Sequence, residues 1–201
     1  AEARAVGASQ MVATATSAVR DAQNGQQFLD AVKQQCDLSI QIISGDEEAT
    51  LSFASAAADF GGDRQLTVVD IGGGSTEFIF GDSDRHIALR KSFQVGSVRM
   101  TERFIASDPP SPGDLTSLRE QLIREFQALP KANASVIGLA GTVTTMFCVA
   151  NRLTNYDPSI VHGAQLHLAQ VQETNQRLAA LPLRLRMTVE GLQPKRADVI
   201  V

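Results

Sequence analysis

The first sixty residues alternate short β-branched runs with longer stretches of helical periodicity. Residues 11–15 form a short apolar run, and residues 39–43 alternate and are rich in isoleucine, so both segments predict strands. Residues 26–36, which lie between them, carry apolar side chains at helical spacing. Residues 45–60 predict another helix, whose acidic first turn suits the positive end of a helix dipole.

After a break at Gly61 and Gly62, strands come first and helices follow. Residues 66–71 form a continuous apolar run, and two more strands are predicted at residues 75–80 and 87–93. Further segments are a helix at residues 96–106, an exposed loop at 108–113, a helix at 115–129, a strand at 135–139, and helices at 143–153 and 166–181. This order predicts an α/β fold, a mixed sheet with helices packed on it.

The most informative segment is the glycine-rich turn between the first two strands of this sheet. It reads, in order, Asp70, Ile71, Gly72, Gly73, Gly74, Ser75, Thr76 and Glu77. Glycines allow positive φ angles and remove the Cβ atoms that keep a ligand away, so backbone N–H groups can point at one phosphate. No Gly-Lys-Ser/Thr follows, and the turn leads into a strand, which excludes a Walker A loop and a Rossmann fingerprint. A tight hairpin with no ligand is the plain alternative.

Carboxylates flank this turn on both sides. Hard oxygen ligands suit Mg²⁺, so Asp70 can hold the ion directly or through water, and Glu77 can do the same or orient a water molecule. A further carboxylate, Glu47, follows Ser44-Gly45-Asp46 at the start of a predicted helix. Phosphoanhydride hydrolysis needs a group that orients or deprotonates water, but acids in a first helical turn are more often dipole partners.

Two other segments are weaker candidates for phosphate contacts. Gly141 and Thr142 form a turn between a strand and a helix, and a helix N-terminus binds anions well, although a simple connection with a threonine cap fits equally. Arg20 follows a turn after a buried strand, and arginine is a natural bidentate phosphate clamp, although most isolated arginines are solvated.

Composition and charge exclude several classes of protein. No apolar run reaches the 18 to 20 residues of a membrane span, and the net charge of −4 argues against an electrostatically driven nucleic-acid binder. The two cysteines, Cys36 and Cys148, lie far apart without metal-ligand spacing, so we expect buried thiols in a reducing compartment and a cytoplasmic protein. The three histidines share no metal spacing either.

Several segments, taken in order, resemble the exopolyphosphatase/guanosine pentaphosphate phosphohydrolase (Ppx/GppA) family. They are ATSAVRDAQNGQQFL from Ala15, IISGDEEATLSF from Ile42, VVDIGGGSTEF from Val68, SFQVGSVRMTE from Ser92, GLAGTVTTM from Gly138, and KRADVIV at the end. The combination of the second with the third is far more specific than either segment alone. The resemblance implies an actin-like fold (ribonuclease H-like, ASKHA), in which two similar domains close on a phosphate chain, and Mg²⁺ dependence.

The resemblance also implies roles for individual residues. Glu47 matches the catalytic carboxylate that activates the attacking water, and Asp70 and Glu77 match the acids around metal and water. The implied phosphate-binding residues are Arg20, the loop residues Gly72, Gly73, Gly74 and Ser75, and the later turn, Gly141 and Thr142.

The sequence departs from the family pattern at its start. Family members begin with a strand and an Asp-Gly-Thr-Asn-Ser-like loop that supplies the other wall of the phosphate site, and this sequence contains no such segment. We therefore expect residues 1–57 to be the C-terminal part of the first actin-like domain and residues 58–201 to be the second domain of a short-form member. Such a fragment is expected to bind phosphate weakly.

Three functions remain open at this point. The first is hydrolysis of terminal phosphoanhydride bonds of inorganic polyphosphate, with water activated by Glu47 and Mg²⁺ as cofactor. The second is 5′-phosphate hydrolysis of guanosine pentaphosphate, and the third is binding of polyphosphate or a nucleotide without turnover. A homodimer is plausible for the family, and neither a nucleic acid nor a membrane is expected as a partner.

Overall fold

A computed structural model describes residues 2–61, 65–82, 84–131 and 136–201. The chain divides into two compact units, Ala1–Glu48 and Ala49–Val201, which are described separately. The division falls in the first turn of helix α4 (Gly45–Phe60), and the predicted domain boundary after residue 57 falls in the same helix. Gly62, predicted as part of a break, lies outside the described residues.

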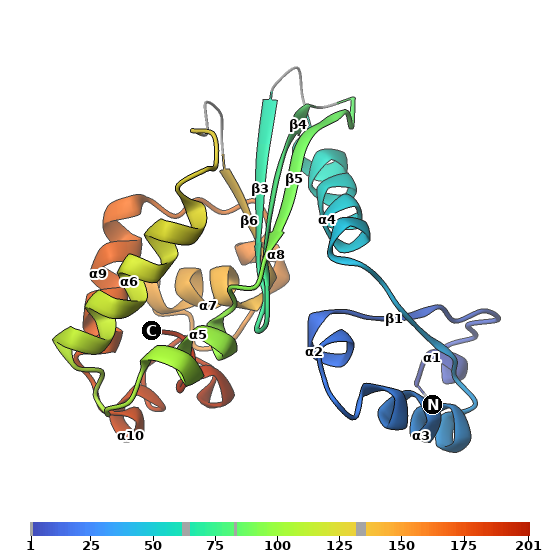
Figure 1. Cartoon of the computed structure of the whole chain (residues 1–201), viewed down its shortest axis with the longest axis horizontal. Coiled ribbons are helices and arrows are strands. Elements are labelled where there is room, and N and C mark those ends of the chain that lie inside the picture. The colour runs from blue at the N-terminus through green and yellow to red at the C-terminus, as the bar shows by residue number, and fades with distance from the viewer. Residues whose placement is uncertain (1, 62–64, 83, 132–135) are drawn as a thin grey trace. The chain divides into compact units, whose positions relative to one another are not determined.

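The first unit contains a pair of short parallel strands with helices around it (Figure 1). Strands β1 (Ala13–Ala15) and β2 (Ile40–Ile42) pair with Ala13 opposite Ile40. The helices are α1 (Glu2–Ala5), α2 (Ser17–Arg20) and α3 (Gly25–Cys36). The predicted strands and the α3 helix are therefore confirmed with small changes of boundary. A turn was expected at Thr16 and Ser17, and α2 begins at Ser17.

The second unit is built on a four-stranded mixed sheet. Its strands are β3 (Gln65–Ile71), β4 (Thr76–Asp82), β5 (Ile87–Phe93) and β6 (Val136–Leu139), in the spatial order β5-β4-β3-β6. The first three form an antiparallel meander, and β6 pairs with β3 in parallel. The predicted α/β class with a mixed sheet is confirmed.

Helices cover both faces of this sheet (Figure 1). Helix α4 packs on one face, and α5 (Ser97–Phe104) and α6 (Pro112–Phe126) pack on the other. The remaining helices of the unit are α7 (Ala140–Ala150), α8 (Pro158–Val161), α9 (Leu168–Ala179) and α10 (Leu183–Arg186), followed by the 3-10 turn η1 (Pro194–Arg196). Among the residues described, no helix is both long enough and apolar enough to cross a lipid bilayer.

The prediction of a loop at residues 108–113 is wrong at its end, because α6 begins at Pro112. Ser111 and Asp114 form a capping box there: the Ser111 side chain accepts from the Asp114 N–H, and the Asp114 carboxylate accepts from the Ser111 N–H. Proline is well suited to the first helical position, because its missing N–H would be unpaired there. Because Ser111 and Asp114 cap the helix, Pro112 and Gly113 begin α6 and do not extend the loop.

Side-chain alternation along β4 divides the core into two layers. Ile79 is fully buried against Phe53 of α4 on one face of the sheet. Phe78 points to the other face, where its ring contacts those of Phe93 and Phe126 at 5.8 and 5.0 Å in edge-on arrangements. A third cluster, which includes Val149 and Leu178, joins α7 to α9 and the C-terminal residues. The first two clusters therefore lie on opposite faces of the sheet.

Candidate active site

The two acids that flank the glycine turn face each other. Asp70 of β3 lies opposite Glu77 of β4 in the antiparallel register, and side chains at such positions stand close together on one face. Glu77 is 1% exposed and Asp70 is half-buried. The structure therefore brings together the two residues predicted as metal ligands, and two hard oxygen donors at one point fit a divalent cation such as Mg²⁺.

Two serines that the sequence prediction did not include orient these acids. Ser52 of α4 donates to Asp70 Oδ2 at 2.8 Å, and Ser92 of β5 donates to Glu77 Oε1 at 2.8 Å. Ser92 pairs with Glu77 across the β4–β5 hairpin, and because the register shifts between Phe80 and Gly81, the lengths of the strands and the turn do not indicate this pairing. The Ser52 contact depends on how α4 packs on the sheet, and no local pattern indicates it.

The glycine turn, residues 72–75, connects β3 directly to β4. The expected positive φ angles are absent there: among the described residues, glycines adopt left-handed φ angles only at Gly7, Gly163 and Gly191. Space is tight at two of the glycines, because a Cβ on Gly73 would lie 3.2 Å from Val98 Cγ2 and one on Gly72 would lie 3.2 Å from the Ser75 oxygen. Part of the reasoning behind the loop prediction was therefore wrong.

Residues 140–142, which were predicted to be a turn, form instead the first turn of helix α7, at the same end of the sheet. Leu139, the last residue of β6, pairs with Asp70 in the parallel register, and α7 begins at the next residue. Ala140 has a φ of 67°, an uncommon angle for a residue with a Cβ, and such strain is often found at functional sites. The predicted residues Gly141 and Thr142 thus lie close in the fold to the Asp70–Glu77 pair and the glycine turn.

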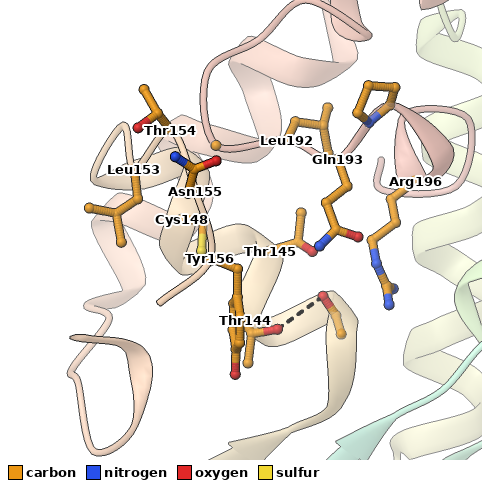
Figure 2. A pocket seen from close by; sticks show the side chains of 13 residues that line it. Thr144, Thr145, Cys148, Leu153, Thr154, Asn155, Tyr156, Leu192, Gln193 and Arg196 are labelled. Carbon is orange, nitrogen blue, oxygen red and sulfur yellow. Dashed lines mark hydrogen bonds between the residues drawn. The ribbon is translucent and has the colours of Figure 1, made fainter. Parts of the chain in front are cut away.

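A pocket of about 420 Å³ opens beside this turn (Figure 2). Gly141, Thr144, Asn155, Tyr156, Gln193 and Arg196 are among its lining residues, and Arg196 is its only charged lining residue in the part of the chain described. A Cβ on Gly141 would overlap the Arg196 guanidinium, so this side chain lies directly over the turn. Cys148 also lines the pocket, and burial raises the pKa of its thiol. No pattern in the sequence indicates this pocket.

Glu47 lies in the first unit, where it takes part in a capping box for α4. Ser44 Oγ accepts from the Glu47 N–H at 3.2 Å, and Glu47 Oε2 accepts from the Ser44 N–H at 2.8 Å and from its hydroxyl at 2.9 Å. These hydrogen bonds, the backbone one first, lower the pKa of Glu47 below its ordinary value of 4.5. The carboxylate is exposed and ionised at neutral pH, so it can orient water.

Arg20 also lies in the first unit, near the end of β2. Its Nη1 donates to the Ile43 carbonyl at 2.9 Å, and its Nε lies 3.8 Å from Asp21 Oδ1. The guanidinium therefore contacts the residue that precedes the Ser44–Glu47 capping box. Arg20 and Glu47 thus approach the same strand end, which the sequence suggested only through the family resemblance.

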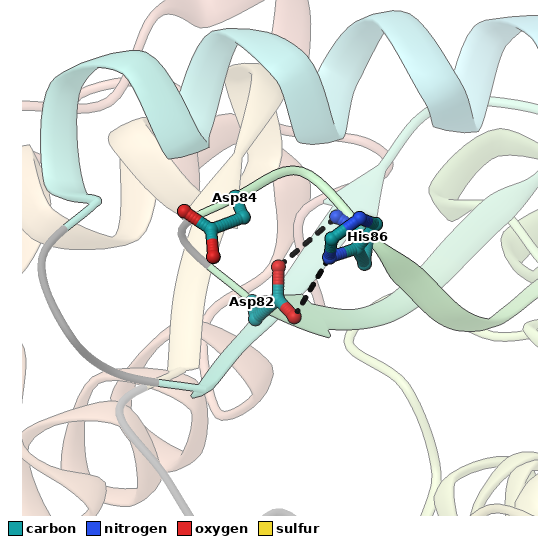
Figure 3. A group of neighbouring side chains, drawn as sticks. All are labelled: Asp82, Asp84 and His86. Atoms are coloured by element: carbon teal, nitrogen blue, oxygen red, sulfur yellow. Dashed lines mark hydrogen bonds and ion pairs between the residues drawn. The ribbon is translucent and has the colours of Figure 1, made fainter.

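A second group of possible metal ligands lies in the turn between β4 and β5 (Figure 3). Atoms of Asp82, Asp84 and His86 lie within 4.8 Å of one another. Asp82 accepts from the His86 N–H at 3.0 Å and lies 3.4 Å from its Nδ1, so these contacts stabilise the turn itself.

An acidic pair and a glycine turn lie at the end of a mixed sheet with helices on both faces, which places the chain among the α/β proteins. Residues 3–201 match the profile of the Ppx/GppA phosphatase family. The chain therefore belongs to the Ppx/GppA phosphatase family, as the sequence motifs indicated.

Relatives and solved structures agree with this assignment. Exopolyphosphatase 2 of Mycobacterium tuberculosis is 34% identical over 197 residues, which are 92% of this chain and 61% of the relative. The Ppx/GppA family member of Aquifex aeolicus superposes with a TM-score of 0.85 at 30% identity over 99% of this chain and 65% of its own. An exopolyphosphatase from Cytophaga hutchinsonii superposes with a TM-score of 0.87 at 26% identity, over 100% of this chain and 66% of its own. The chain thus spans about 60% of the length of the Mycobacterium relative.

Proposed function

We propose that this chain is part of an enzyme that hydrolyses the terminal phosphoanhydride bond of inorganic polyphosphate. The observation that carries this proposal is the Asp70–Glu77 pair next to the glycine turn, which combines acidic groups for a cation with backbone donors for a phosphate. The exopolyphosphatase names of several relatives support the substrate class. The net charge of −4 does not oppose it, because a few local donors suffice to hold a polyanion.

In the proposed reaction, a water oxygen attacks the terminal phosphorus and the bridging P–O bond breaks. The products are one inorganic phosphate and a chain shorter by one unit, which leaves with its negative charge on the former bridging oxygen. We assign to Glu47 the role of orienting the water and accepting its proton. Because the pKa of Glu47 is lowered, the carboxylate is ionised at neutral pH, which is the form that can orient the water and accept its proton.

The phosphate-binding role is assigned to the N–H groups of the glycine turn, to Arg20 and to the Gly141–Thr142 turn. Asp70 and Glu77 would hold Mg²⁺, since two opposed carboxylates held by serine hydroxyls suit a hard cation. When bound, the ion would neutralise charge on the phosphate oxygens. Without it, the two carboxylates would repel the substrate.

The test is Mg²⁺-dependent phosphate release from long-chain polyphosphate. The assay is run on this chain and on a longer version, to which the part of the relatives that this chain does not cover has been added. Glu47→Gln should lose most activity while remaining folded. Asp114→Asn is a matched control because Asp114 also belongs to a helix capping box, and it should retain activity. Normal activity of Glu47→Gln in an active longer version would refute the Glu47 assignment, and inactivity of both wild-type proteins would refute the polyphosphate substrate.

The pocket beside Gly141 favours a second candidate, 5′-phosphate hydrolysis of guanosine pentaphosphate. One arginine, two carboxamides and a tyrosine ring, with no lining carboxylate among the described residues, suit a phosphorylated nucleoside. Rates with the two substrates, measured side by side, decide between them. Tyr156→Ala should reduce turnover of the pentaphosphate and spare that of polyphosphate if the pocket holds the nucleoside. Tight binding by calorimetry without any released phosphate would favour the third possibility, a protein that binds without turnover.

A further inference from the structure

The carbonyl groups of all three loop glycines accept hydrogen bonds from the first turn of α5. The Ser97 N–H donates to the Gly72 oxygen at 3.0 Å, and the Arg99 N–H donates to the Gly73 oxygen at 3.1 Å. The Gly74 oxygen accepts from Arg99 Nε at 2.7 Å, the shortest of the three bonds. One residue, Arg99, therefore binds two consecutive peptide carbonyls, once with its backbone and once with its side chain.

These bonds determine where the N–H groups of the loop point. In a trans peptide the carbonyl and the following N–H lie on opposite sides of the bond. With the three carbonyls directed at α5, the N–H groups of Gly73, Gly74 and Ser75 point away from that helix. Within the described part of the chain, none of these three N–H groups donates a backbone hydrogen bond. Three successive N–H groups that donate no backbone hydrogen bond can together bind an anion.

The same contacts strengthen the donors electrostatically. The N-terminus of a helix carries partial positive charge, and the Arg99 side chain adds a full charge beside it. A carbonyl that accepts a bond from such groups is polarised, and the N–H of the same peptide becomes a better donor. The positive charge at the N-terminus of α5 thus makes the N–H groups of the loop stronger hydrogen-bond donors to an anion.

The close approach of α5 requires a glycine at position 96. A Cβ there would overlap the carbonyl atoms of Gly73, and its φ of −144° is open to any residue, so the requirement is space alone. Thr76 Oγ1 also donates to the carbonyl of Val95 at 2.5 Å, which ties β4 to the residue before Gly96. The segment from Val95 to Arg99 is therefore built against the loop.

We propose that Arg99 is a positioning residue, which orients the N–H groups of Gly73, Gly74 and Ser75 toward a phosphate of the substrate. The proposal deepens the proposed function and rests on it, because the phosphate is that of the hydrolysed chain. Arg99 acts through the loop, and no contact between its own side chain and the substrate is required.

The kinetic test uses Arg99→Met and Arg99→Lys in whichever version of the enzyme releases phosphate. Loss of a charge-assisted hydrogen bond should raise KM for polyphosphate about tenfold in Arg99→Met, with a much smaller effect on kcat. Arg99→Lys should recover part of this loss, because an ammonium group can still reach the Gly74 carbonyl. Arg103→Met is the matched control from the last turn of the same helix, where the guanidinium stacks on Phe104, and its KM should not change. Equal KM values for Arg99→Met and wild type would overturn the proposal and leave the hydrolase function intact.

A binding test separates the two proposals if no version hydrolyses polyphosphate. The amide NMR signals of Gly73, Gly74 and Ser75 are followed in the 201-residue chain while inorganic pyrophosphate is added. The positioning role predicts shifts of all three signals in wild type and in Arg103→Met. In Arg99→Met it predicts weak shifts or none, provided that the other signals of the spectrum show that this variant is folded. Shifts of the same size in Arg99→Met, or none in wild type, would overturn it.

Discussion

Asp70 and Glu77 stand opposite each other across the β3–β4 hairpin, with Glu77 almost completely buried. Like charges directly opposite on adjacent strands destabilise a sheet. The serine hydroxyls of Ser52 and Ser92 reduce this cost without adding positive charge. A cation between the carboxylates would remove the repulsion, so the hairpin itself should respond to divalent ions.

The first prediction concerns the thermal stability of the protein with and without Mg²⁺. The ion should raise the Tm of wild type, since a ligand that binds only the folded state stabilises it. Asp70→Asn should abolish this rise, and its Tm without Mg²⁺ should match or exceed that of wild type, because the repulsion is gone. Asp84→Asn, in the other acidic group, should keep the full rise. A rise that survives in Asp70→Asn but not in Asp84→Asn would move the ion site to the β4–β5 turn.

The second prediction concerns pH. Because the pKa of Glu47 is lowered in the folded state, the stability it contributes is present above its ordinary pKa of 4.5 and is lost as pH falls through the lowered value. If Glu47 orients the water, the acid limb of kcat/KM that it causes lies below pH 4.5. Ser44→Ala removes the hydroxyl bond to Glu47, so it should move this limb to higher pH and lower the Tm by the loss of a helix cap. A lower Tm with an unmoved limb would leave Glu47 with a capping role only.

The candidate site was partly predictable, for reasons that differ from residue to residue. The Asp70–Glu77 pairing follows from two strands joined by a four-residue turn, which is local information. Arg99 and Gly96 belong to a segment that resembles the family, but the sequence indicates no role for them, because their contacts with the glycine turn depend on where α5 packs. Ala140 gave no signal at all, since no sequence rule assigns a left-handed φ to alanine. Local geometry was thus readable, and contacts made by tertiary packing were not.

The third prediction tests the contact between α5 and the loop through stability. Gly96→Ala places a methyl group on the Gly73 carbonyl, so it should cost about 1–3 kcal/mol of unfolding free energy, as other overpacked sites do. Gly113→Ala, in the exposed first turn of α6, should be neutral or stabilise by up to about 1 kcal/mol. Urea unfolding of both variants measures the difference. Equal stabilities would mean that α5 moves away from the loop at little cost, and the loop would then tolerate other arrangements.

The fourth prediction concerns Arg186, a charged side chain that is only 3% exposed. Its nitrogens donate to the carbonyls of Leu178, Leu181 and Ala197 at 3.1, 2.9 and 2.9 Å. Burial lowers the pKa of this guanidinium, and the nearby Asp108, 3.6 Å away, opposes that change.

Arg186→Met should therefore destabilise the protein by about 3–5 kcal/mol, since it leaves several buried carbonyls without donors. Asp108→Asn removes only a half-exposed charge, so it should cost about 1 kcal/mol or less. Urea unfolding distinguishes the two, and equal costs would mean that the ion pair, rather than the carbonyl contacts, holds this region together.

Ala197 directly follows Arg196, so a folded Arg186→Lys variant should loosen the wall of the pocket. If that pocket holds a nucleoside, this variant should lose turnover of guanosine pentaphosphate and keep turnover of polyphosphate.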